Sequence, residues 1–222
     1  MRSWKTTLVL PALLLLLAPF ASAQWSDNFD AYTLGSLAGQ GGWGTWDDDP
    51  TCDAFVVNTL SHSSPNCVQV QTTTDAVHLF SETSGQWVIT AWQFIPSGST
   101  GLTYFILLNS YQSGGPYDWS LDLEFDCDLG LMTVVEGTGA AFIVENQWVE
   151  IKVEFDLDGC TQSIYYNGAF VETIPWQTTG VNEFRALDLF ADTGSAVYYD
   201  DISLQLNAGL APATWGQIKT LL

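Results

Sequence analysis

An alternating acidic segment is the first feature of the sequence that could carry chemistry. Every second residue from 122 to 128 is a carboxylic acid: Asp122, Glu124, Asp126 and Asp128. Successive side chains of a β-strand point to opposite faces, so a strand here would present all four carboxyl groups on one face. Such a row is suited to general acid and base catalysis. The alternative is a solvent-facing strand of a very acidic protein.

Aromatic residues form the second candidate site. Tyr111, Tyr117 and Trp119 flank a turn formed by Gly114-Gly115-Pro116. Aromatic ring faces pack against the C–H faces of sugars much as they pack against other apolar groups. The three side chains are therefore a candidate ligand-binding platform, with packing in a core as the alternative. Trp46 and Trp176 are further candidates for the same role.

The N-terminus and the charge balance indicate an exported protein that does not bind nucleic acid. Residues 1–23 read as a signal peptide: a basic start, a short apolar run, and Ala21-Ser22-Ala23 before the cleavage point. We therefore expect a secreted or cell-envelope location and no membrane span in the mature protein. Three basic residues (Lys152, Arg185 and Lys219) then face 25 acidic ones, so the mature net charge is 3 − 25 = −22. That charge repels phosphate backbones and favours bound cations.

Four cysteines remain after the signal peptide: Cys52, Cys67, Cys127 and Cys160. An even number in an exported chain predicts two disulfides, and three pairings are possible. We favour Cys52–Cys67 and Cys127–Cys160, because each joins segments that could lie close together as neighbouring strands. A zinc site is the alternative, but the chain contains no Cys-x-x-Cys pair.

The rest of the chain is typical of an all-β protein. Apolar and polar residues alternate over 68–71, 87–92, 121–126 and 149–155, and Gly, Pro, Ser and Asn clusters separate these runs. The segment 104–108 is almost wholly apolar, which predicts a strand buried on both faces. Asn167-Gly168 predicts a type I′ hairpin turn. We expect about a dozen strands in a two-sheet antiparallel β-sandwich over 24–206, followed by a linker-like tail over 207–222.

Several short segments together resemble the concanavalin A-like lectin/glucanase superfamily, in particular the laminin-G-like jelly-roll domains of bacterial secreted proteins. The resemblance covers about residues 25–206. It rests on 27–32 (DNFDAY), 35–37 (GSL), 42–46 (GWGTW), 85–87 (GQW), 147–156 (QWVEIKVEFD), 165–168 (YYNG) and 198–204 (YYDDISL). It implies a jelly roll, a fold that hosts lectins, carbohydrate-binding modules, hydrolases, lyases and adhesion modules alike.

The resemblance sharpens the interpretation of the acidic segment. Glucanases of this superfamily carry a Glu-x-Asp-x-Glu strand whose glutamates act as nucleophile and as general acid and base. The segment from Glu124 to Asp128 is similar, but Asp128 stands in place of the last glutamate. Aspartate is one methylene shorter, which disturbs the carboxyl spacing that retaining chemistry needs. We therefore expect Glu124, Asp126 and Asp128 to be non-catalytic.

The resemblance also implies a metal site. First and last strands of this fold are usually neighbours, which would bring Asp27 and Asp30 close to Asp200 and Asp201. Clustered carboxylate oxygens suit Ca²⁺, so we predict a structural calcium ion at these four residues. The alternative is that they are ordinary turn and strand-end aspartates.

These observations together predict a secreted, non-catalytic binding module, most simply one that binds carbohydrate and carries a structural Ca²⁺. Two alternatives stay open: a glycan hydrolase or lyase that uses the strand 122–128, and a purely structural or adhesive extracellular domain. The expected partner is a glycan or an extracellular surface.

Overall fold

The computed structural model describes residues 24–177 and 180–207. The predicted signal peptide and, apart from Asn207, the predicted C-terminal tail lie outside the described residues. Within the described part of the chain, no helix is long and apolar enough to cross a membrane.

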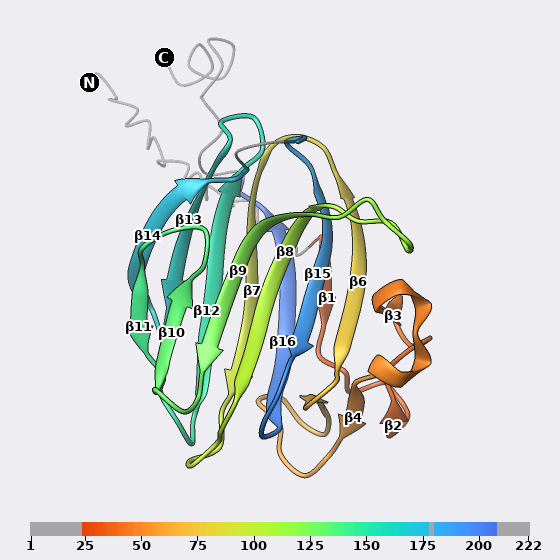
Figure 1. Ribbon diagram of the computed structural model, residues 1–222. Coiled ribbons are helices and arrows are strands. Elements are labelled where there is room, and N and C mark those ends of the chain that lie inside the picture. Colours follow the sequence, from red (N-terminus) through yellow and green to blue (C-terminus); the bar gives the residue numbers. More distant parts are fainter. Residues whose placement is uncertain (1–23, 178–179, 208–222) are drawn as a thin grey trace, which may run out of the picture.

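Two antiparallel sheets pack face to face, so the prediction of an all-β sandwich is confirmed (Figure 1). The nine-stranded sheet has the order β14-β13-β12-β7-β16-β5-β4-β2, with β1 also paired to β16. The seven-stranded sheet has the order β11-β10-β9-β8-β15-β6-β3. Short 3-10 turns η1 (Trp46–Asp48) and η2 (Pro50–Cys52) follow β3.

The strands of the nine-stranded sheet are β1 (Trp25–Asp27), β2 (Gly35–Ser36), β4 (Phe55–Val57), β5 (Cys67–Val70), β7 (Gln86–Phe94), β12 (Trp148–Asp156), β13 (Thr161–Tyr166), β14 (Ala169–Pro175) and β16 (Val197–Leu206). Those of the seven-stranded sheet are β3 (Trp43–Thr45), β6 (Asp75–Glu82), β8 (Leu102–Ser110), β9 (Asp118–Asp126), β10 (Leu131–Val134), β11 (Ala140–Phe142) and β15 (Phe184–Ala191).

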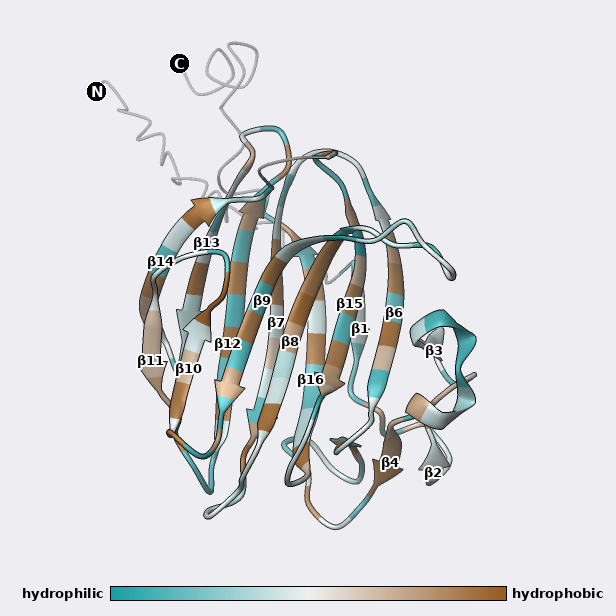
Figure 2. Cartoon of the chain, viewed as in Figure 1, coloured by the Kyte–Doolittle hydropathy of each residue, from teal (hydrophilic) through white to brown (hydrophobic). Residues whose placement is uncertain are grey.

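The core between the sheets follows from the alternation in the sequence. Along β12, the apolar residues Val149, Ile151, Val153 and Phe155 are buried, while the residues between them are partly exposed. Figure 2 shows the same banding of hydrophobic and hydrophilic residues along β12 and β9. One face of each such strand therefore joins the core and the other faces outward.

The central strands of the seven-stranded sheet are apolar on both faces. Ile106 and Leu108 on β8 point away from the main core and form a second buried cluster with Val77 and Ala186. The prediction of a doubly buried strand over 104–108 is thus confirmed. Because the outer side of this sheet is apolar at its centre, other side chains must cover it, and these build the candidate site.

Two local predictions are also confirmed. Tyr166 pairs with Ala169, and the intervening Asn167 and Gly168 have φ of +51° and +75°, as a type I′ turn requires. The first and last strands, β1 and β16, are antiparallel neighbours in which Asp27 lies opposite Ile202.

The predicted disulfide Cys52–Cys67 is wrong. All four cysteines, each of them in the described part of the chain, are free thiols. Cys67 pairs with Val57 across the β4–β5 ladder, five residues along the chain from Cys52. Cys52 ends the 3-10 turn η2 and lies near Asp75 and Asp188 of the seven-stranded sheet. Cys67 instead belongs to the nine-stranded sheet and lies near Asp200.

The predicted disulfide Cys127–Cys160 is wrong for the same kind of reason. The Gln162 side chain donates to the Ser120 carbonyl at 2.6 Å, so the turn that holds Cys160 lies near the start of β9. Cys127 follows the end of β9, seven residues after Ser120, a separation of roughly 23 Å along the strand. Sequence spacing did not reveal that the two thiols lie toward opposite ends of the sandwich.

Candidate functional site

The register of the seven-stranded sheet brings distant residues together on its outer face. One row across four strands contains Val77, Asp188, Ile106 and Asp122, each directly opposite the next. The neighbouring row contains Asp75, Phe190, Tyr104 and Glu124 in the same strand order. Side chains two residues apart share a face, so these eight form one continuous surface.

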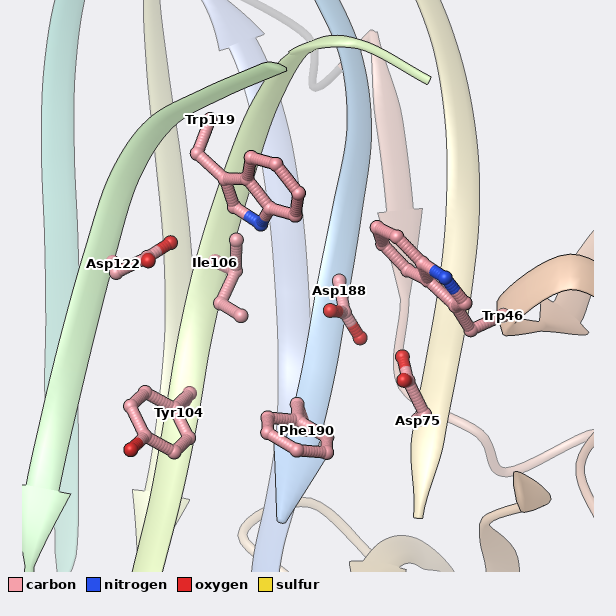
Figure 3. A pocket seen from close by; sticks show the side chains of 8 residues that line it. All are labelled: Trp46, Asp75, Tyr104, Ile106, Trp119, Asp122, Asp188 and Phe190. Carbon is pink, nitrogen blue, oxygen red and sulfur yellow. The ribbon is translucent and has the colours of Figure 1, made fainter. Parts of the chain in front are cut away.

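A hollow of about 280 Å³ opens on this surface. Three carboxyl groups, four aromatic rings and one aliphatic side chain line it: Trp46, Asp75, Tyr104, Ile106, Trp119, Asp122, Asp188 and Phe190. Figure 3 shows the carboxyl groups of Asp122, Asp188 and Asp75 in a band across β9, β15 and β6, with tryptophans at one side and Tyr104 and Phe190 at the other. The volume is at the small end of the range for ligand pockets.

The aromatic side of the hollow is organised around Trp46. Its ring lies 4.8 Å from the ring of Tyr111, 4.7 Å from Tyr117 and 6.1 Å from Trp119, centroid to centroid. The structure therefore brings together the three aromatic residues predicted from the sequence. Of these three, Trp119 lines the hollow and is 41% exposed, so its ring face is available to a ligand.

Contacts from Asp47 hold Trp46 in place. The Asp47 carboxylate accepts hydrogen bonds from the Gly114 backbone N–H at 2.8 Å and from the Tyr117 hydroxyl at 2.5 Å. Ser113 donates to Asp48 at 2.6 Å. The 3-10 turn η1 is thus tied to the loop between β8 and β9, and this tie fixes the aromatic wall.

The other side of the hollow is a stacked pair. The rings of Tyr104 and Phe190 lie 5.4 Å apart at an interplanar angle of 24°. The Tyr104 hydroxyl donates to Glu124 at 2.8 Å. Glu124 therefore positions the Tyr104 ring rather than lining the hollow itself.

The carboxyl groups of the hollow are buried without full hydrogen bonding. Asp188 is only 2% exposed. Asp75, Asp122 and Asp188 each have a buried Oδ1 atom with no hydrogen-bond partner among the described residues. Such an atom is costly to bury, so the hollow has an unmet capacity to accept hydrogen bonds from a ligand.

Burial also raises the pKa of these acids. Burial, and secondarily the nearby Glu136 and Glu124, raise the pKa of Asp122 to about 7. Burial raises the pKa of Asp75 to about 6. The pKa of Asp188 rises well above its usual range because the group is fully buried and lies beside Asp75. Close to neutral pH these carboxyl groups are therefore protonated to a larger extent than exposed aspartates would be.

The predicted acidic row is only partly formed. Asp122 and Glu124 lie on the outer face of β9, but the strand ends at Asp126. The Asp126 carboxylate accepts from the Leu129 backbone N–H at 2.9 Å, and Asp128 accepts from the Gly101 N–H at 3.2 Å. The expectation that Asp128 shares the strand face is wrong, because residues 127–130 turn away to form the β9–β10 connection.

Trp176 does not belong to the site. Its side chain is completely buried in the main core, stacked on Phe155 with 4.5 Å between ring centroids. Its indole N–H donates to the Glu183 carbonyl at 3.0 Å. The suggestion that Trp176 contacts a glycan is therefore wrong.

The four aspartates predicted to bind calcium lie near the paired ends of β1 and β16, and Asp27 is already hydrogen-bonded within the protein. Asp27 accepts from the Phe29 N–H at 2.9 Å, the Trp43 indole at 2.9 Å and the Tyr32 hydroxyl at 2.5 Å. Asp30 accepts from the Asn66 backbone N–H at 3.1 Å. These bonds tie the first loop to its surroundings.

Asp200 and Asp201 hold a different loop. Asp200 accepts from the backbone N–H groups of His62, Ser63 and Asp201 at 2.7, 3.0 and 2.7 Å. Burial raises the pKa of Asp200 to about 6, although these bonds act in the opposite direction. Asp201 contacts the His62 ring at 2.5 Å. Among the described residues, no group of three or more acidic, histidine or cysteine side chains is arranged to hold a metal.

Sequence reasoning missed Asp75, Asp188, Tyr104 and Phe190. One signal was present: Asp188 is the single acid of β15 and lies between Leu187 and Leu189. A lone carboxyl group between apolar neighbours on a central strand is expensive to bury, which makes it a candidate for function.

Comparisons with known proteins agree on the fold. No family model and no curated protein matches the chain. Among solved structures, a sialidase is similar with a TM-score of 0.59 and 10% identity, over 85% of this chain and 19% of that one. The endo-β-1,4-glucuronan lyase of the fungus Trichoderma reesei is similar with a TM-score of 0.52 and 9% identity, over 84% and 96%.

A sialidase of Trypanosoma rangeli is similar with a TM-score of 0.51 and 16% identity, over 78% of this chain and 30% of that one. The chain thus spans about a fifth of the first sialidase and under a third of the second. At these identities the likeness shows the fold alone, a two-sheet antiparallel β-sandwich.

Proposed function

We propose that this protein is an exported, non-catalytic module that binds a glycan on the outer face of the seven-stranded sheet. One observation carries the proposal: the tryptophans Trp46 and Trp119 border a hollow in which buried carboxyl oxygens lack hydrogen-bond partners. An apolar wall beside a few convergent polar groups is the general form of a small-molecule site.

A sugar ring suits both parts of the hollow. Its C–H face packs on an indole ring, and its hydroxyl groups donate hydrogen bonds to carboxyl oxygens. Each unpartnered oxygen that gains a donor removes an unfavourable term from the folded protein. The acidic lining disfavours anionic sugars, because bringing a second negative charge to a desolvated carboxylate is repulsive.

The same face offers room beyond one ring. A second hollow of about 310 Å³ adjoins the first across β6 and is lined by Tyr111, Gln112 and Ser113 among others. Tyr111 also packs edge-on against Trp46, so this aromatic pair stands between the two hollows. We infer that the natural ligand is an oligosaccharide or polysaccharide rather than a single sugar.

The solved structures support this proposal only by analogy of fold. The lyase is named for its action on glucuronan, so one protein with a similar fold acts on a glycan. Fold alone does not assign function, so the argument depends on the hollow.

Affinity electrophoresis tests the proposal. The purified protein is run in native gels that contain laminarin, mixed-linkage β-glucan, xylan or chitosan. We expect at least one polysaccharide to retard it and Trp119→Ala to remove that retardation, because the variant loses the exposed ring of the hollow. Phe142→Ala is the matched control, since Phe142 is an exposed aromatic residue on the edge strand β11.

Two results would overturn the proposal. Retardation that survives Trp119→Ala would place the ligand elsewhere, and no retardation at all would leave a structural or adhesive domain. Release of reducing ends or of unsaturated sugars from any of the polysaccharides would instead favour a hydrolase or lyase that uses Asp122 in the hollow.

A further inference from the structure

The hollow carries negative potential that no basic residue of its own offsets. Its lining contains three aspartates and no Lys, Arg or His. Of the basic residues that the structure describes, Lys152 pairs with Glu154 at 2.8 Å and Arg185 with Glu183 at 2.5 Å. Neither residue belongs to the lining of the hollow, so a positive charge there has to come from outside the protein.

We propose that the hollow selects glycans that carry a protonated primary amine, the glucosamine class, over neutral and N-acetylated glycans. The inference rests on the proposed function and names the class of sugar that this site takes. Its geometric basis is Asp188, which is 98% buried, lines the hollow, and has an Oδ1 atom without a hydrogen-bond partner.

An ammonium group satisfies the hydrogen-bonding capacity and the charge of these carboxyl groups better than a hydroxyl group does. It provides three N–H donors and a full charge. Asp188 and Asp75, on adjacent strands, present two unpartnered oxygens, while Asp122 lies two strands from Asp188 and contributes its charge from a greater distance. Hydrogen bonds between ionised partners are roughly twice as strong as neutral ones. A hydroxyl group gives one donor and no charge, so it leaves most of the carboxyl repulsion in place.

The aromatic rings favour the same ligand. Indole and phenol faces attract cations through the ring quadrupole, and Trp46, Trp119 and Tyr104 all line the hollow. A calcium ion fits less well, because it needs six to eight oxygen ligands and most of the remaining lining is aromatic or aliphatic. The rings also separate an amino sugar from a simple amine, since only the sugar has a C–H face to stack.

Without a ligand, protons take the place of the cation. Burial, and secondarily the nearby Asp75, raise the pKa of Asp188, so this carboxyl group keeps its proton to a higher pH than an exposed aspartate does. Asp122, with a pKa of about 7, is also partly protonated near neutral pH. An ammonium group that enters the hollow displaces these protons into solution, whereas a neutral sugar leaves them in place.

Other titratable groups lie around the hollow on the surrounding elements, and the acidic ones among them also raise the pKa values of its carboxyl groups. Asp47 on η1 raises the pKa of Asp75, and Glu124 and Glu136 raise that of Asp122. Burial, and to a lesser extent the charges of Asp75 and Asp188, raise the pKa of the Cys52 thiol. Asp47, Glu124 and Glu136 are acidic, so all three strengthen the attraction to a cation, while the thiol of Cys52 is uncharged.

Calorimetry at pH 6.5 and 0.15 M salt tests the inference. The titrants are the trisaccharides of glucosamine, N-acetylglucosamine and glucose in β-1,4 linkage, and cadaverine as an amine without a ring. We expect the glucosamine trisaccharide to bind at least tenfold more tightly than the other three. Its binding enthalpy should change between phosphate and imidazole buffers, because released protons are taken up by buffers with different ionisation heats.

The variants separate a site from general attraction. Asp188→Asn and Asp75→Asn should each bring the ratio of glucosamine to N-acetylglucosamine affinity close to one. Asp158→Asn removes the same charge from an exposed turn and should leave the ratio unchanged. If Asp158→Asn lowers the ratio as much as Asp188→Asn does, the preference comes from the acidic surface as a whole and the inference fails.

Failure of this inference differs from failure of the proposed function. Equal affinity for the three trisaccharides, lost in Trp119→Ala, would retain glycan binding and refute the amine preference. Equal binding of cadaverine and the glucosamine trisaccharide would refute the need for a sugar ring. No binding of any titrant, together with no retardation in the gels, would refute both proposals.

Discussion

Two sets of aspartates in this protein are buried or half-buried but are surrounded in opposite ways. At the seam where β1 meets β16, Asp27 and Asp200 each accept three hydrogen bonds from the protein itself. In the hollow on the seven-stranded sheet, Asp75, Asp122 and Asp188 each keep an oxygen atom without a partner.

The difference separates structural carboxylates from those left for a ligand. A carboxylate whose oxygens meet backbone N–H groups fixes a loop, and its removal leaves several donors unsatisfied. A carboxyl group that is buried beside other acids opposes folding, and its removal relieves the protein. The same chemical change, aspartate to asparagine, should therefore have opposite effects in the two regions.

The largest effect is expected at the seam. Asp27→Asn places an amide nitrogen at one of the two oxygens that now accept from the Phe29 N–H, the Tyr32 hydroxyl and the Trp43 indole. Bonds to a charged acceptor contribute about 1.5–3 kcal/mol each, so we expect a loss of about 3 kcal/mol in the free energy of unfolding. For a domain of this size that loss lowers the melting temperature by roughly 6–12 °C.

Thermal melts at pH 8 in the presence of a chelator measure this change. Asp158→Asn, in an exposed turn, serves as the control and should melt within about 2 °C of the unsubstituted protein. A melting temperature unchanged by Asp27→Asn would show that the seam carboxylates do not hold the loop.

An effect of opposite sign is expected in the hollow. A carboxyl group whose pKa is raised on folding binds protons more tightly in the folded state, so the free energy of unfolding falls as pH rises above its unfolded pKa of about 3.9. Asp75, with a pKa of about 6, and Asp122, with a pKa of about 7, set this window at about pH 4–7. Asp188→Asn removes the most buried member of the group, so we expect it to raise the melting temperature at pH 8.

The pH dependence identifies the cause of that gain. At pH 4 the carboxyl groups are protonated in both proteins, so the advantage of Asp188→Asn should shrink toward zero. Melts of the two proteins at pH 4, 6 and 8 measure it. A variant that is less stable at pH 8 would mean that Asp188 is held by favourable contacts, and the contrast between the two regions would then be lost.

The smallest effect concerns calcium, which stays a prediction for the seam. Asp27 and Asp201 both line a surface hollow of about 630 Å³ there. A tenfold excess of Ca²⁺ over its Kd would add about 1.4 kcal/mol, or roughly 3–6 °C in melting temperature. Asp201→Asn should remove that gain. Equal melting temperatures with calcium and with chelator, at matched ionic strength, would leave the seam aspartates with a structural role alone.

The sequence predicts local features of this fold well. Alternation identified β7, β9 and β12, and the pair Asn167-Gly168 identified the β13–β14 hairpin, because both signals lie within a few residues of each other. The cluster of Tyr111, Tyr117 and Trp119 could also be predicted, since the three residues flank one loop.

Features that depend on the pairing of distant strands could not be predicted from the sequence. Asp75, Asp122 and Asp188 meet only because β6, β9 and β15 lie in one sheet with β8 between them, and nothing in the spacing along the chain reports that order. The disulfide predictions failed for the same reason. Proximity in sequence did not say where along its strand each cysteine would lie, or at which end of the sandwich.

The doubly buried strands β8 and β15 have a consequence for how tightly the hollow can hold a ligand. They form its floor, carry Ile106 and Asp188, and are covered by the main core on one side and by the second apolar cluster on the other. Amide hydrogens in such strands exchange with solvent only when the whole domain opens. A ligand that enters the hollow meets a floor that is already rigid, so little conformational entropy is lost on binding.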